Sequence, residues 1–379
     1  MVQEPPAAEE PPTGAEPPSP AAEKSRRRPR WLVPIAVAAV VLGIAYLVAQ
    51  NYTSKLYALA PGGTLPVQGA ITVKAPPNQV HNHNGRILLV TVSLRSVQPI
   101  TYVFDQLDPN VQVVHQRDLI GNSKPSQQGQ VDAVQMDTST QTAAVVALRH
   151  LGYQVNIQNL GTLVAEVEAH SPADGRLVPG DTITAIDGTP TPTNDVLQTV
   201  IRSHQPGQTV TLAIRPATGA DRTETVKLGQ SPRSEGTPHA FLGISTSTKE
   251  QAQLPLDVTI DPGNIGGPSA GLAFTLGVLD KLSTTDITGG RVIAATGTID
   301  PDGSVGPIGG IVQKTAAVRR AGAVAFLVPP DEYAQAEQHA GSHLRVIKVN
   351  NLDDALNALR SLGGDLSGIT PAPARAAAA

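Results

Sequence analysis

The chain has 379 residues, a formal net charge of −4, no cysteine and 3% aromatic residues. This length suits about two or three domains of ordinary size. The lack of cysteine excludes disulfides and thiolate metal sites, and the balance of charge offers no basic field for nucleic acid. We therefore expect no nucleic-acid partner, and cores built mainly from Val, Ile, Leu and Ala.

The N-terminal 50 residues divide into two parts. Residues 1–30 are rich in Pro, Ala and Glu and end in a basic cluster, a composition that predicts disorder. Residues 31–50 are apolar and uncharged, which is about the length needed to cross a bilayer. Because the basic cluster comes first, the positive-inside rule predicts a single-pass anchor with a cytoplasmic N-terminus and extracytoplasmic domains. A cleaved signal peptide is the alternative interpretation.

The region that follows is predicted to contain strands, then one helix, then a β-rich unit. β-Branched runs predict strands, and apolar residues at helical spacing predict helices. The predicted strands are 70–73, 86–92, 153–157, 162–167, 182–186, 209–214 and 256–260. The predicted helices are 138–151 and 194–203.

Within the β-rich unit, residues 170–188 resemble the PDZ family. They contain Ser-Pro-Ala, then Leu-x-Pro-Gly-Asp, then Ile-x-x-Ile-Asp-Gly. The resemblance implies a PDZ-like domain over 136–232, with a peptide-binding groove between one strand and one helix. Carried over by position, the groove residues are Leu151, Gly152, Tyr153, Val155, Val196 and Val200. A PDZ fold that only docks against its neighbouring domain is the alternative.

A glycine-rich loop precedes the next predicted helix. It reads Gly266-Gly267-Pro268-Ser269, and leucines at 272, 276, 279 and 282 predict a helix that begins at Ser269. The positive end of a helix and its unpaired N–H groups favour an alkoxide or an oxyanion there. Serine is also a preferred N-cap residue, so this loop alone leaves both roles open.

Lys314 is the candidate base for this serine. The pattern predicts a helix over 312–321 on which Ala317, Val318 and Ala321 share the face of Lys314. Burial among apolar residues favours the neutral amine that a general base requires. Lys281 lies about 18 Å from Ser269 along the same predicted helix, which is too far. A lysine whose tip reaches water is the alternative for Lys314.

These residues resemble the proteolytic domain of the Lon proteases. The matching motifs are Gly-Pro-Ser-Ala-Gly at 267–271, Ala-Thr-Gly-Thr-Ile at 295–299 and Gly-x-Val-x-Pro-Ile-Gly-Gly at 303–310, with Lys314. The resemblance implies a protease domain over 233–362, with Ser269 as nucleophile, Lys314 as base and Thr296 beside the lysine. It makes Gly266, Gly267 and Pro268 supporting residues. Many Lon enzymes carry an acidic residue where this chain has Gly266, so we expect a more flexible loop here.

The whole arrangement resembles the bacterial membrane-anchored, PDZ-containing Lon-like proteases. The resemblance implies an α+β fold with one transmembrane helix and a PDZ-like domain inserted in, or preceding, the protease domain. Residues 51–135, with their predicted strands, form the strand-rich N-terminal part of the protease region, and the small-residue composition of the chain end predicts a disordered tail over 363–379. No P-loop pattern occurs, so we expect no ATP. His81 and His83 have no further ligand cluster beside them in the sequence, so we expect no metal, and no cofactor is implied. The expected partners are protein or peptide substrates, the lipid bilayer through residues 31–50, and further copies in a ring. The expected activity is cleavage of exported or envelope proteins at the bacterial cytoplasmic membrane.

Two other functions remain open from the sequence. Gly267-x-Ser269-x-Gly271 also fits the nucleophile elbow of Ser-His-Asp α/β-hydrolases. The acid would be Asp300 or Asp331 and the base His339 or His343. The other alternative is a non-catalytic PDZ scaffold at the membrane.

Overall fold

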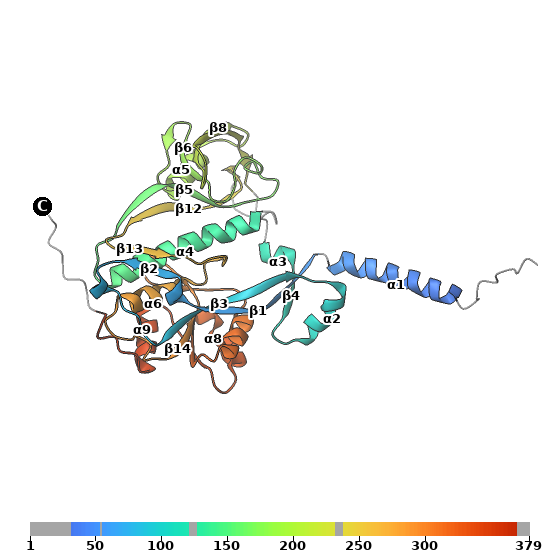
Figure 1. The fold of residues 1–379 in the computed structure, drawn as a ribbon. Helices are drawn as coiled ribbons and strands as arrows, with labels where there is room; N and C mark the ends of the chain where they lie inside the picture. The colour runs from blue at the N-terminus through green and yellow to red at the C-terminus, as the bar shows by residue number, and fades with distance from the viewer. Residues whose placement is uncertain (1–31, 54, 121–126, 232–237, 370–379) are drawn as a thin grey trace, which may run out of the picture. The chain divides into compact units, whose positions relative to one another are not determined.

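The computed structural model describes residues 32–53, 55–120, 127–231 and 238–369 (Figure 1). The predicted disordered segment 1–30 lies outside the described residues, as do residues 370–379 of the predicted tail. The chain divides into two units, the first ending at Gln50 and the second beginning at Asn51.

The helix α1 (Leu32–Thr53) is 22 residues long and apolar on all sides. Within the part of the chain that the structure describes, Pro34–Thr53 is the one helical stretch long and apolar enough to cross a membrane. It continues three residues beyond the predicted end at residue 50. Its length and composition suit either a membrane anchor or a signal sequence.

A six-stranded mixed sheet forms the centre of the second unit. In order, its strands are β18 (Arg345–Lys348), β17 (Ala325–Val328), β14 (Val292–Ala295), β3 (Arg86–Ser96), β1 (Leu56–Pro66) and β4 (Gln112–His115). The first four run parallel to one another, and β1 is antiparallel to both β3 and β4. Residues 87–90 are consecutive apolar residues of β3, and all four are buried. Such an uninterrupted apolar run is typical of a strand covered on both faces.

Helices cover both faces of this sheet. Ile87 and Leu89 of β3 face a core that includes side chains of α4 (Gln128–His150), α6 (Gly271–Leu282) and α9 (Leu352–Ser361). Leu88 and Val90 of the same strand face α7 (Ile311–Arg320) and α8 (Pro330–Ala340). The smaller elements of this unit are β2 (Ile71–Lys74) paired with β13 (Asp257–Ile260), β15 (Thr298–Ile299) paired with β16 (Val305–Gly306), α2 (Pro99–Leu107) and α3 (Gln116–Ile120).

A second sheet with its own core lies between α4 and β13 in the chain. Its strands, in order, are β12 (Ile244–Gln253), β5 (Asn156–Val167), β6 (Thr182–Ile186), β8 (Thr209–Arg215) and β9 (Arg222–Lys227). It is completed by β7 (Thr189–Pro190), α5 (Asn194–Ser203) and the pair β10 (Gly229–Gln230) and β11 (Ala240–Phe241). Because β3 before it and β14 after it pair in the central sheet, this β-rich domain is inserted in the surrounding α+β domain. That confirms the predicted fold class.

Three predicted details differ from the structure. The boundary expected at residue 136 falls inside α4, whose buried side chains belong to the core of the central domain. The boundary expected at 233 lies before β12, although β12 pairs with β5 of the inserted sheet along its length. Leu366 and Ile369 pack against the central core, so residues 363–369 are ordered, contrary to the prediction. In each case, packing partners distant in the sequence decide the outcome.

Candidate active site

Ser269 lies just before α6, and its hydroxyl is not a helix cap. The helix begins at Gly271 with Ala270 as N-cap residue, two positions later than predicted. The Ser269 hydroxyl oxygen instead lies 2.8 Å from the Lys314 amine nitrogen. The N-cap interpretation of this serine is therefore wrong, and its side chain is available for other chemistry.

Lys314 is buried in the first half of α7, and only 3% of its surface is exposed. Burial lowers its pKa to about 8, against a smaller opposing effect of the Glu332 carboxylate. The interpretation of a lysine with its tip in water is wrong for this position. A lysine with a pKa near 8 has an appreciable neutral fraction at neutral pH, so it can accept a proton from a hydroxyl.

Thr296 connects the lysine to the backbone of the serine. It is fully buried, and its hydroxyl oxygen lies 3.3 Å from the Lys314 amine nitrogen. The same hydroxyl donates to the Ser269 carbonyl oxygen at 3.1 Å, and the Gly297 N–H donates to that oxygen at 3.0 Å. These contacts hold the Ser269 peptide in place and leave the serine hydroxyl directed at the amine.

The helix α4 holds the glycine-rich loop from its other side. The Gly267 N–H donates to the Asp132 carbonyl oxygen, and the Ser139 hydroxyl donates to the Pro268 carbonyl oxygen, both at 3.0 Å. A Cβ at Gly266 would lie 2.6 Å from the Cβ of Asp132, so a larger residue there would displace α4. The expectation of a loosely held loop is therefore wrong. Ser139 was missed, since nothing in the sequence links it to a loop about 130 residues away.

Two backbone N–H groups beside Ser269 remain available to a ligand. Pro268 has no N–H, and the Gly267 N–H is already bonded to Asp132. The N–H groups of Ser269 and Ala270 have no hydrogen-bond partner among the residues that the structure describes. Paired donors at a helix N-terminus are the kind of group that stabilises an oxyanion.

The histidines of the alternative triad lie elsewhere. The Nδ1 atom of His339 lies 2.8 Å from the Gln335 carbonyl oxygen within α8. His343 lines a separate cavity of about 570 Å³ together with Arg319 and Arg320. Within the described ranges, the Ser269 hydroxyl contacts Lys314 and no histidine. This arrangement gives no support to a Ser-His-Asp triad.

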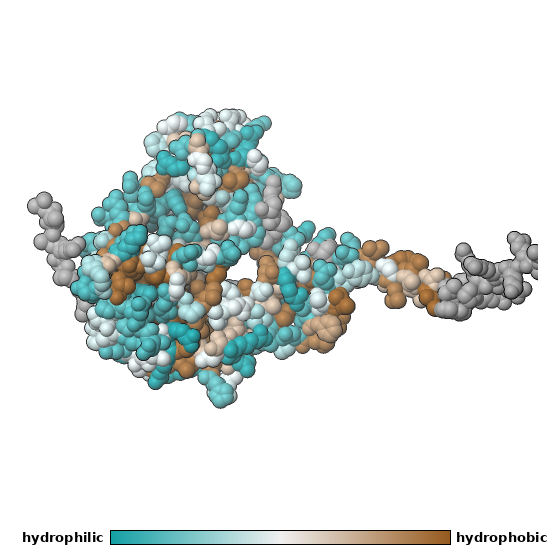
Figure 2. All heavy atoms as spheres, viewed as in Figure 1, coloured by the Kyte–Doolittle hydropathy of each residue, from teal (hydrophilic) through white to brown (hydrophobic). Residues whose placement is uncertain are grey.

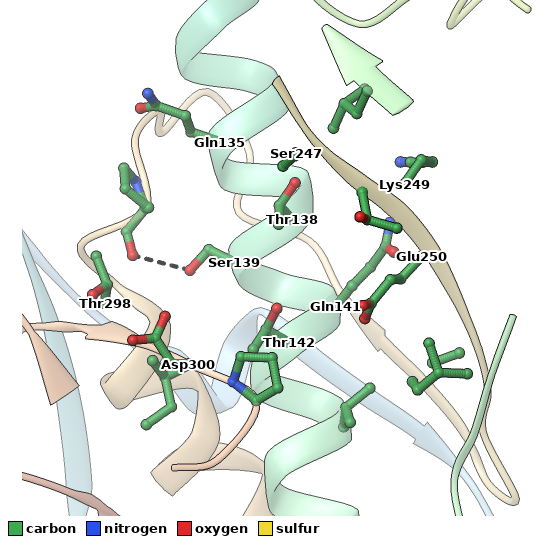
Figure 3. A pocket seen from close by; sticks show the side chains of 18 of the residues that line it. Gln135, Thr138, Ser139, Gln141, Thr142, Ser247, Lys249, Glu250, Thr298 and Asp300 are labelled. Atoms are coloured by element: carbon green, nitrogen blue, oxygen red, sulfur yellow. Dashed lines mark hydrogen bonds between the residues drawn. The ribbon is translucent and has the colours of Figure 1, made fainter. Parts of the chain in front are cut away.

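A cleft of about 500 Å³ opens next to the glycine-rich loop (Figure 3). One wall is the face of α4 that carries Gln135, Thr138, Gln141 and Thr142, as Figure 3 shows. The opposite wall is formed by β5 and β12, and Pro268 and residues 298–301 close one end. An ion pair between Lys249 of β12 and Asp137 of α4, at 3.2 Å, joins the two walls. The residue preceding Ser269 thus forms part of the cleft.

A smaller cavity of about 220 Å³ lies in the inserted domain between α5 and the start of β12. Its lining residues are Leu197, Gln198, Ile201, Arg202, His239, Ala240, Phe241, Leu242, Gly243, Ile244 and Thr246. This is the arrangement expected of a peptide groove, with a glycine-containing turn before an edge strand and a helix opposite. The run Phe241-Leu242-Gly243-Ile244 before an alternating strand was the overlooked sequence signal.

The six groove residues predicted from the sequence do not line this cavity. Leu151 is buried in the core of the central domain at the end of α4, and Tyr153 packs against that core. Gly152 and Val155 lie in the link between α4 and β5. On α5, Val200 packs into the core of the inserted domain, and neither it nor Val196 lines the cavity. The prediction placed the carboxylate-binding turn before β5, whereas the structure places such a turn before β12.

Comparisons with known proteins identify two domain families in the chain. Residues 150–228 match the PDZ domain family, and residues 241–361 match the Lon protease (S16) C-terminal proteolytic domain. The Lon protease of Chloroflexus aggregans is 29% identical over 120 residues, which cover 31% of this chain and 14% of that protein. Lon protease 1 of Sorangium cellulosum is 32% identical over 132 residues, covering 34% of this chain and 16% of that protein.

Among solved structures, the PDZ domain of an SdrC-like protein from Listeria monocytogenes aligns at 29% identity with a TM-score of 0.21. The alignment covers 23% of this chain and 87% of the Listeria chain. The curated relatives are aligned over about one seventh of their length. The chain therefore carries a PDZ domain together with a Lon-type proteolytic domain of the serine peptidases.

Proposed function

We propose that the chain is a serine endopeptidase in which Lys314 activates Ser269. The observation that carries the proposal is the 2.8 Å separation of the two reactive atoms, with the amine buried and its pKa lowered to about 8. A serine hydroxyl is a weak nucleophile until a neighbouring base removes its proton. A lysine whose pKa is about 8 has a neutral amine in part of its population near neutral pH, and that amine supplies the base.

In the proposed mechanism, the neutral Lys314 amine takes the proton from Ser269 as the serine oxygen attacks the substrate carbonyl carbon. The N–H groups of Ser269 and Ala270 donate to the oxyanion of the tetrahedral intermediate. The Lys314 ammonium then protonates the leaving amine, and an acyl-enzyme remains. Water, deprotonated by Lys314, hydrolyses the ester and restores Ser269. The Glu332 carboxylate favours the ammonium form that exists between these proton transfers.

The cleft between α4 and β12 is the proposed site for the substrate chain beside the scissile bond. Its volume of about 500 Å³ lies within the roughly 300–1,000 Å³ usual for ligand sites. Apolar side chains such as Val145 of α4 and Ile157 of β5 line the cleft together with hydroxyl and amide groups of α4. An extended peptide likewise presents both apolar side chains and hydrogen-bonding groups. Because Pro268 lines the cleft, a bound peptide would pass directly by Ser269.

The cleft assignment predicts a KM effect for Gln141→Trp. This exposed residue of α4 faces the cleft, and an indole there fills space that the peptide needs. We expect KM for an unstructured protein substrate to rise by about tenfold or more with little change in kcat. The rate at which a small fluorophosphonate labels Ser269 should be unchanged, because the probe does not occupy the cleft.

The matched control is Gln338→Trp, which places the same side chain on an exposed position of α8. It should leave KM and labelling as in the wild type. An unchanged KM in Gln141→Trp, or a parallel fall in labelling and turnover, would show that the peptide does not use the cleft.

The remaining parts of the proposal concern substrate supply and location. No P-loop pattern occurs in the chain, so we propose ATP-independent cleavage of segments that are already unfolded. The groove between α5 and β12 would hold an extended C-terminal segment of the substrate.

The apolar helix α1 would anchor the protein, with the basic cluster on the cytoplasmic side and the domains outside. Exported and envelope proteins are then the substrate class. The Lon resemblance favours a ring of identical chains.

Labelling with a fluorophosphonate tests the proposed activity directly. The full-length protein in detergent or bilayers should be labelled at Ser269 alone and should cleave casein without added nucleotide. Ser269→Thr, which keeps a hydroxyl but adds a methyl group, should lose most of both properties. A folded protein that is neither labelled nor active would favour the non-catalytic scaffold. Dependence of cleavage on ATP would contradict the ATP-independent mechanism.

A further inference from the structure

The short helix α2 exposes an apolar face to its surroundings. Ile100, Val103, Phe104 and Leu107 are 74%, 59%, 69% and 74% exposed. At about 100° per residue, these four positions fall within an arc of roughly 100°. Figure 2 shows hydrophobic residues gathered over this helix. The usual amphipathic pattern of a surface helix is thus reversed, with its apolar stripe outward.

The other face of α2 is attached to the protein body. Tyr102 packs against the small core formed by Leu56, Ala58 and Val97. Asp105 is 4% exposed, and its carboxylate accepts a hydrogen bond from the Arg95 guanidinium. These contacts orient the helix, so the outward position of the apolar stripe is a consequence of packing rather than of a loosely attached segment.

The same small core begins directly after the apolar stretch that ends at Thr53. Only Ser54 and Lys55 separate Thr53 from Leu56, a reach of about 10 Å at most. In addition, the rings of Tyr52 and Tyr102 meet edge to face, with centroids 6.1 Å apart. Tyrosines concentrate at the membrane–water interface. If α1 spans the bilayer, Tyr52 lies at that interface and α2 lies within one ring contact of it.

We propose that the apolar face of α2 inserts into the lipid interface beside the end of the membrane span. This inference rests on the proposed membrane anchoring through α1. The polar zone on each side of a bilayer is about 6 Å thick, and the small core lies at most about 10 Å from Thr53 along the chain. The small core is therefore held within, or just outside, the polar zone. Interfacial helices bury an apolar face about 5–10 Å deep, which four large side chains can fill. A second contact with lipid would fix the height of the protease domain above the membrane, which an attachment at one point does not do.

Single-tryptophan proteins test this contact in the full-length chain. The chain contains one tryptophan, Trp31, so Trp31→Phe provides a background without intrinsic tryptophan fluorescence. Three proteins are made from it, carrying Phe104→Trp, Leu42→Trp in α1, or Val324→Trp at a 41% exposed position before β17. Each is reconstituted in phosphatidylcholine vesicles with and without brominated acyl chains, which quench tryptophan on contact.

Brominated lipid should quench Leu42→Trp and Phe104→Trp by about twofold or more and leave Val324→Trp unchanged. Adding Ile100→Ser and Leu107→Ser to the Phe104→Trp protein should reduce its quenching. Quenching of Leu42→Trp without quenching of Phe104→Trp would overturn the lipid contact alone. Absence of quenching in both Leu42→Trp and Phe104→Trp would overturn the anchoring through α1 as well.

A second copy of the chain is the other possible occupant of this face, and cross-linking distinguishes it from lipid. The chain has no cysteine, so Phe104→Cys introduces a unique thiol. Efficient disulfide formation between copies in vesicles, together with unquenched fluorescence of Phe104→Trp, would assign the face to a protein interface and overturn the proposal. Poor cross-linking with strong quenching is the expected result.

Discussion

Replacing Ser269 by Ala should lower kcat/KM for an unstructured protein substrate by at least about 10⁴-fold, and Lys314→Ala should lower it by a similar factor. The double variant should cost little more than either single one. The physical reason is that the hydroxyl and the amine act as one unit across 2.8 Å, so removing either removes the activated nucleophile. Residual activity would come from the oxyanion donors and the cleft alone.

Lys314→Arg sharpens this test. Arginine keeps the positive charge and the length of the side chain, yet its guanidinium does not deprotonate in a protein. It should therefore be as inactive as Lys314→Ala. Lys281→Ala, at a half-buried position in the last turn of α6, is the matched control and should retain wild-type turnover. Strictly multiplicative losses in the double variant, or an active Lys314→Arg, would exclude lysine as the base.

The pH dependence of turnover is the second large expected effect. The ammonium of Lys314 is inactive as a base, and burial lowers its pKa to about 8. Activity should therefore rise tenfold per pH unit below pH 8 and level off above it, so that kcat/KM at pH 6 is about 50-fold below its value at pH 8. The measurement is kcat/KM between pH 6 and pH 9.5 on a peptide without titratable groups.

Glu332→Gln should move this profile toward lower pH. The Glu332 carboxylate raises the pKa of Lys314, so neutralising it releases the lysine proton at a pH below 8. Glutamine keeps an oxygen that can accept the Ile308 N–H, which now donates to Glu332 at 3.0 Å. Glu337→Gln, an exposed position of the same helix, should leave the midpoint unchanged. A shift to higher pH in Glu332→Gln would contradict the assignment of the midpoint to Lys314.

Several elements were predictable because their cause is local. The strand 182–186 and the helix 194–203 have the same bounds in the structure as in the prediction. Their causes are local, because the residue types of the strand lie within one short segment and the side chain of Thr193 caps the helix that follows it. Ser269 and Lys314 were found as candidates because the glycine-rich loop and the apolar face of Lys314 are both visible in short stretches. The PDZ domain likewise followed from one short motif over residues 170–188, and the α+β class followed from the resemblance of several short motifs to the Lon proteolytic domain.

Other features depend on contacts between distant residues. The strand β12 pairs with β5 across about 80 to 100 positions, so the glycine-containing turn beside the cavity precedes β12, whereas the prediction placed it before β5. The loop before Ser269 was expected to be flexible because of Gly266, yet α4 holds it through Asp132 and Ser139. Lys314 and Thr296 meet because α7 packs on the central sheet and Thr296 directly follows β14, a strand of that sheet.

For this protein, then, the sequence alone determined the order of the domains, the apolar N-terminal stretch and the choice of Ser269 and Lys314 as candidate nucleophile and base, because each depends on local composition or on a short motif. Only the tertiary structure decided that Ser269 is not a helix cap, that Lys314 is desolvated, and that α2 turns its apolar face outward. These properties depend on which surfaces are removed from water when remote segments pack together, and no local pattern contains that information.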